Sequence, residues 1–106
     1  MEVAEVPVNA DELFDIVTKV VFDCGYSQTA TDRSRRRLRV NTGVSGFSWG
    51  EIVEVYVDPR NEGKSIVHVM ARRRLPGNVG SRPSKIARDL LGKIVAECNS
   101  PELPRT

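Results

Sequence analysis

The sequence predicts an α+β domain in which five antiparallel strands form one sheet and two helices pack on one face of it. Residues 51–57 and 65–71 alternate polar and apolar side chains across a turn that contains proline and glycine, which is typical of an antiparallel hairpin. Residues 10–24 and the stretch that ends at Cys98 carry apolar residues at intervals of three and four, as amphipathic helices do. The predicted order is strand, helix, four strands, helix, so the two helices can share one face of the sheet.

Length and composition indicate a single folded unit. The 106 residues fit one domain, which we expect at residues 1–98, followed by a flexible tail at residues 99–106. A formal net charge of +2 is too small to indicate a nucleic-acid-binding protein by itself. The first residues lack the features of a signal peptide, and no apolar run approaches the ~18 residues of a membrane helix. The expected location is therefore the cytoplasm.

The first strand and the first helix have recognisable boundaries. Residues 2–8 alternate weakly and include Pro7, which has no amide donor and suits an edge strand. Asn9 is expected to cap the helix N-terminus with its side-chain oxygen, and Gly25 is a natural left-handed end. The apolar stripe between them consists of Leu13, Ile16, Val17, Val20, Val21 and Cys24.

Two further strands are expected at residues 26–30 and 35–41, joined by a tight turn at residues 31–34. Leu38 and Val40 share one face of the second of these strands. The other face carries Arg35, Arg37, Arg39 and Asn41.

The second helix is expected to open at Ser81 or Ser84, with Pro83 in its first turn. Its predicted buried stripe consists of Ile86, Leu90, Leu91, Ile94, Val95 and Cys98. Gly92 lowers helix stability relative to alanine, so we expect it to mark a close approach to the sheet or to the first helix.

The sheet face without helices is the candidate binding surface. If the valines of the hairpin face the helices, the other parity of each strand faces outward. The candidate binding residues are Arg37, Arg39, Tyr56, His68, Met70, Arg72 and Arg74. This mixture fits an acidic protein partner, self-association, or single-stranded nucleic acid with stacked bases, although the small net charge weighs against nucleic acid. The alternative is a solvated face on which arginines keep the sheet soluble and Glu54 offsets part of their charge.

Other candidate sites are weaker. Trp49, in a loop with three glycines, is expected either to cap the core or to anchor a partner, and the usual burial of tryptophan favours the core. That loop lacks the motifs of phosphate-binding loops. Residues 77–81, before the second helix, are a weak candidate for holding an anion at the helix N-terminus. Cys24 and Cys98 are expected to be reduced and buried, because they belong to no CxxC or Cys/His group.

No catalytic constellation is expected. His68 is the single histidine of the chain and lies on a predicted strand. Glu51 and Glu54 occupy opposite faces of one strand and cannot act as a carboxylate pair. We therefore predict a non-catalytic binding module with no metal and no cofactor.

Two resemblances accompany this prediction. Over residues 2–98 the order of elements resembles the β-α-β4-α arrangement of TATA-binding-protein-like folds and, in elaborated form, the helix-grip lipid- and hormone-binding superfamily. The latter implies an alternative function, a carrier that holds a small amphipathic ligand between helices and sheet. The segments 43–45, 48–51 and 72–76, with the alternation at Val67 and Val69, are similar to a group of small bacterial proteins of uncharacterised function. The chain departs from that group after Pro76, where it lacks a second Trp-Gly, and this resemblance implies no activity.

Overall fold

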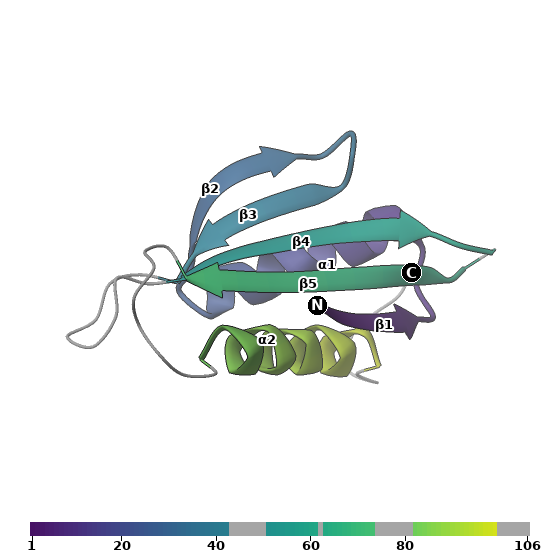
Figure 1. The fold of residues 1–106 in the computed structure, drawn as a ribbon. Helices are drawn as coiled ribbons and strands as arrows, with labels where there is room; N and C mark the ends of the chain where they lie inside the picture. Colours follow the sequence, from purple (N-terminus) through teal and green to yellow (C-terminus); the bar gives the residue numbers. More distant parts are fainter. Residues whose placement is uncertain (43–50, 62, 74–81, 100–106) are drawn as a thin grey trace.

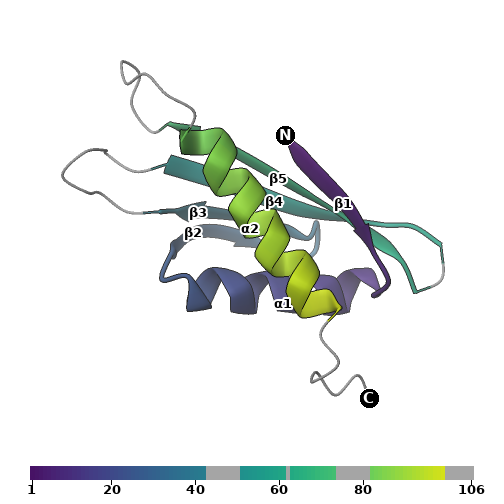
Figure 2. The same cartoon turned by 90° about the horizontal axis from the view of Figure 1, so that it is seen from below.

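The computed structural model describes residues 1–42, 51–61, 63–73 and 82–99 and has the predicted architecture (Figure 1). The elements are β1 (Glu2–Val6), α1 (Ala10–Asp23), β2 (Ser27–Asp32), β3 (Arg37–Asn41), β4 (Glu51–Pro59), β5 (Ser65–Arg73) and α2 (Arg82–Cys98). All strand pairs are antiparallel, in the order β1-β5-β4-β3-β2. Both helices lie on one face of the sheet and cross each other there (Figure 2). The opposite face, which we call the open face, has no described element over it.

The β4–β5 hairpin has the predicted register. Val55 pairs with Val69, and Tyr56 pairs with His68. The valines of both strands face the helices and are at most 3% exposed, whereas Tyr56 and His68 lie on the open face and are half-buried. Each strand runs two residues further than predicted, to Pro59 and Arg73, and Pro59 sits at the end of β4, where the ladder stops.

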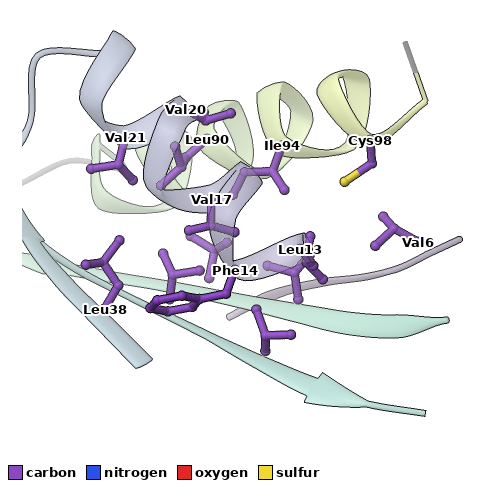
Figure 3. Close-up of a cluster of buried hydrophobic side chains, with 14 of the residues drawn as sticks. Val6, Leu13, Phe14, Val17, Val20, Val21, Leu38, Leu90, Ile94 and Cys98 are labelled. Carbon is purple, nitrogen blue, oxygen red and sulfur yellow. The ribbon is translucent and has the colours of Figure 1, made fainter. Parts of the chain in front are cut away.

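The boundaries of α1 confirm both predicted signals. The side-chain oxygen of Asn9 accepts a hydrogen bond of 2.8 Å from the backbone N–H of Glu12. Gly25 has a φ of 77° in the left-handed region. Phe14, which the predicted stripe omitted, is 1% exposed and lies at the centre of the core with Leu13 and Val17 (Figure 3).

The β2–β3 turn lies later than predicted. It occupies residues 33–36, and Arg36 adopts a positive φ of 53°. The Asp32 side chain accepts hydrogen bonds from the Ser34 hydroxyl (2.7 Å) and from the Arg35 backbone N–H (3.2 Å). An aspartate whose side chain accepts a hydrogen bond from a backbone N–H that follows it in the chain favours a turn that begins at the next residue. This explains why β2 extends through Asp32.

The packing of α2 differs from the prediction in two respects. The fully buried residues are Ala87, Leu90, Ile94 and Cys98, whereas Ile86, Leu91 and Val95 are partly exposed. The helix crosses β5 and β1 at one side of the sheet, so its buried stripe is narrower than the apolar pattern (Figure 2). The expectation for Gly92 is wrong, because Gly92 is exposed and an added Cβ would meet nothing within 4 Å. Residues 100–106 of the predicted tail lie outside the described residues.

The register of the central hairpin predicts that neighbouring positions differ in how well they tolerate a charged side chain. We expect Val55→Asp to unfold the domain, because an unpaired carboxylate in the core destabilises a fold by more than ~4 kcal/mol. Tyr56→Asp is the matched control on the open face and should keep the fold. Thermal unfolding followed by circular dichroism measures both, and equal melting temperatures would contradict the register.

The two described helix-associated glycines predict opposite effects of alanine. Gly92→Ala should raise the free energy of unfolding by about 1 kcal/mol, since the site is an open helix interior. Gly25→Ala should lower it by about 1 kcal/mol, because alanine is strained at a φ of 77°. Urea denaturation measures both changes, and a loss of stability in Gly92→Ala would show that the glycine is needed for packing.

Candidate binding surface on the open sheet face

The open face is organised in rows that run across the strands. One row, which we call the central row, contains Asp32, Arg37, Tyr56, His68 and Val3, each paired with the next. The neighbouring row contains Ala30, Arg39, Glu54 and Met70. Residues from four or five different strands therefore meet, although they are far apart along the chain.

The side chains of the central row stack against one another. The Tyr56 and His68 rings are nearly parallel, with centroids 4.4 Å apart and planes inclined by 9°. On the other side of Tyr56, the Arg37 guanidinium carbon lies 5.6 Å from the ring centroid. Because β4 runs between β3 and β5, Tyr56 has a neighbour against each face of its ring. Cation–π and aromatic contacts of this kind hold the row in place.

Hydrogen bonds fix both rings of the stack further. The Tyr56 hydroxyl donates to the sulfur of Met1 at 3.7 Å. His68 Nε2 lies 2.8 Å from Asp58 Oδ2, which is the next open-face carboxylate along β4. The stack is therefore ordered by contacts within the domain itself.

Most arginines of the β2–β3 hairpin have carboxylate partners. The four ion pairs are Arg33–Asp15 (2.9 Å), Arg35–Asp32 (3.8 Å), Arg36–Asp11 (3.0 Å) and Arg39–Glu54 (3.0 Å). Two of them connect the turn to α1, where the Arg33 guanidinium also lies 5.0 Å from the Phe14 ring centroid. Within the described parts of the chain, Arg37 and Arg72 on the open face have no carboxylate within 4.0 Å.

The open face also carries more negative charge than the sequence predicted. Asp58 and Glu5 lie on it with Glu54, because β1 pairs with β5 and places Glu5 opposite Ile66. Asp32 lies beside Arg37, and the hydrogen bond from Ser34 keeps the pKa of its carboxyl below its usual value. The surface is therefore mixed in charge rather than uniformly basic.

A shallow hollow of about 490 Å³ lies on the open face over β2, β3 and β4. Its lining includes Asp32, Arg37, Arg39, Glu54, Tyr56 and Met70. Four of the predicted binding residues, namely Arg37, Arg39, Tyr56 and Met70, are thus brought together at one place. The hollow combines two cations and two carboxylates with an aromatic ring and a thioether.

The remaining predicted site residues are dispersed. His68 lies behind Tyr56 in the stack, and Arg72 lies opposite Ile52 near the far ends of β4 and β5. Trp49 and Arg74 lie outside the described residues. Two apolar residues that the prediction missed, Met1 and Val3, are 64% and 50% exposed. Val3 belongs to this face because it pairs with His68, a neighbour that no local pattern in β1 reveals.

The two cysteines differ in environment, which corrects the expectation that both are buried. Cys98 is fully buried in the core (Figure 3). Cys24 is partly exposed at the C-cap of α1, and Lys93 Nζ donates to its sulfur at 3.7 Å. Nearby, burial raises the pKa of the Tyr26 hydroxyl.

The described residues show neither a metal site nor a membrane-spanning helix. Across the described ranges, no group of three or more His, Cys, Asp or Glu residues is arranged to hold a metal ion. Neither described helix combines the length and the apolar character needed to cross a membrane. No protein-family model matches the chain, and no curated protein matches it significantly.

The environments of the thiols predict different reactivities. In native buffer, 5,5′-dithiobis(2-nitrobenzoic acid) should label Cys24 well before Cys98, which should react only when the domain unfolds. The absorbance at 412 nm follows both reactions, and Cys24→Ser should remove the faster phase. Equal rates for the two thiols would contradict their different burial.

Proposed function

We propose that the protein is a small non-catalytic interaction module that binds a partner protein through the open face of its sheet. The observation that carries this proposal is a five-stranded sheet with both helices on one side. On the other side it presents the Arg37–Tyr56–His68 stack with Met1 and Val3 exposed nearby. Aromatic, methionine and arginine side chains together are typical of the centres of protein interfaces.

The dimensions of the open face suit such an interface. β4 and β5 each have nine residues, which corresponds to a length of about 30 Å. β1, β2 and β3 are shorter, with five or six residues each, so at strand spacings of about 4.8 Å the face covers about 500 Å². A standard interface buries about 800 Å² on each partner, so this face supplies most of one.

The stack favours a protein over a single-stranded nucleic acid. Proteins that bind single strands offer exposed aromatic faces on which bases stack. Here Arg37 and His68 flank both faces of Tyr56. Four of the five arginines at residues 33–39 already have carboxylate partners, which lowers the charge available for phosphates.

The filled interior disfavours a ligand carrier. A carrier of the helix-grip type needs a cavity between helices and sheet. In the described core, side chains from both layers meet in that space, and Leu13, Phe14, Leu90 and Ile94 are at most 2% exposed (Figure 3). The hollow of about 490 Å³ lies on the other side of the sheet.

The surroundings of the single histidine favour binding over catalysis. His68 has Asp58 on one ring nitrogen, while its Nδ1 is buried and has no hydrogen-bond partner among the described residues. In the described part of the chain, no hydroxyl or thiol bonds to this ring, so a nucleophile activated by a base is not assembled.

Charge reversal on the open face tests this proposal. We expect Arg37→Glu combined with Arg72→Glu to abolish partner capture without lowering the melting temperature, because exposed charges contribute little to stability. The measurement is affinity capture by the tagged full chain from its source cells, with the captured proteins identified by mass spectrometry.

The matched control is Lys85→Glu combined with Arg88→Glu, which makes the same charge change on the exposed side of α2. This variant should keep every partner. If the open-face variant also retained all wild-type partners, the face would be a solvated surface and the proposal would fall.

A further inference from the structure

We propose that the hollow on the open face is a subsite for a carboxylate with an adjoining apolar group, such as an acidic side chain beside a leucine or phenylalanine in a partner protein. This inference rests on the proposed function and deepens it, because it names the part of the partner that the face recognises. Arg37 is the residue that we expect to bind the carboxylate.

The charges around the hollow leave one cation unmatched. Arg39 Nη2 is paired with Glu54 at 3.0 Å. Asp32 accepts a hydrogen bond from the Ser34 hydroxyl and faces the Arg35 guanidinium. Among the described residues, this leaves Arg37 as the charged group of the lining without an ionic partner. A single negative charge would complete the set.

The same charges favour a carboxylate over a phosphate. Glu54 and Asp32 line the hollow with Arg37. An incoming phosphate carries up to two negative charges, and among the described residues of the lining only Arg37 lacks an ionic partner, so the second charge would meet no unpaired cation. A guanidinium also presents a planar pair of N–H donors that matches the two oxygens of a carboxylate.

The position of Arg37 is set before the ligand binds. Its guanidinium lies over Tyr56, which is held in turn by the His68 ring and by the hydrogen bond to Met1. Ordering a long side chain in advance reduces the entropy that is lost on binding. Arg37 is nevertheless exposed, so an anion can reach it.

Other residues that line the hollow offer apolar surface for the apolar group of the ligand. Tyr56, Met70 and Ala30 contribute an aromatic edge, a flexible thioether chain and a methyl group. A volume of about 490 Å³ is within the range of small-ligand pockets and holds one or two side chains. An amphipathic acidic segment therefore fits better than an isolated carboxylate ion.

A peptide pair tests the subsite with the full chain. Acetyl-Leu-Phe-Glu-Asp-Leu-amide and its Gln/Asn twin differ only in carboxylate charge, and ¹⁵N NMR titration measures the binding of each. We expect the acidic peptide to bind at least tenfold more tightly and to shift the signals of Arg37, Tyr56 and Met70. Arg37→Gln should weaken it by about ten- to a hundredfold, as the loss of a charge-assisted hydrogen bond does.

Two controls separate the subsite from general electrostatics. Arg60→Gln removes the same charge from an exposed arginine in the β4–β5 turn and should leave binding of the acidic peptide unchanged. Phenylacetate should bind at the same residues but more weakly than the peptide, whereas equal affinity would identify a small acid as the ligand of the same site. Equal binding of the two peptides, or no shift at Arg37 and Tyr56 with either, would overturn the inference. Tighter, Arg37-dependent binding of inorganic phosphate or of a ten-residue oligothymidylate would overturn it as well.

Failure of the subsite proposal can be distinguished from failure of the proposed function. Single variants in the capture experiment make the distinction, because Arg72 lies on the open face but outside the lining of the hollow. If Arg72→Glu reduced capture while Arg37→Gln did not, the open face would remain the binding surface and the subsite would fall. If neither variant reduced capture, both proposals would fall.

Discussion

The two-residue alternation of β4 and β5 is the constraint on which the rest of the structure depends. Val55 and Val69 pair with each other and bury one parity of the hairpin under the helices. Because successive side chains of a strand point to opposite faces, Tyr56 and His68 must lie on the other face of the sheet. The core and the candidate binding surface are therefore two consequences of one register, and a shift by a single residue would exchange them.

The open face differs from a generally basic surface because its charges are matched locally. The β2–β3 turn uses Arg33 and Arg36 to reach α1, and Arg39 is paired with Glu54 on the next strand. Exposed pairs of this kind add little stability, but they remove charge that phosphates would otherwise meet. The positive charge that stays available belongs to Arg37, which is positioned by the stacked Tyr56 and His68 rings rather than by a carboxylate.

A surface of this composition is suited to recognition by shape and charge together. Both faces of the Tyr56 ring are occupied, so the surface presents the edge of that ring, a methionine and an ordered guanidinium beside a hollow. The helices stay behind the sheet and fill the core (Figure 3), so that binding on the open face need not disturb packing. Because the open face lies on the opposite side of the sheet from the core, we expect charge changes there to leave the fold intact.

The sequence by itself determined the order and class of the elements, the Asn9 and Gly25 boundaries of α1 and the two faces of the central hairpin. These features arise from contacts between residues close together along the chain, or from the strict period of a strand. The tertiary structure alone decided that β1 lies beside β5 and that Val3 and Glu5 join the open face. It alone decided as well that arginines of the β2–β3 hairpin find carboxylates on α1 and β4. It also decided that Phe14 is central to the core while Cys24 is partly exposed. Strand order and cross-strand pairing bring together residues that are distant in sequence. A local sequence pattern therefore does not predict which distant residue a side chain will contact.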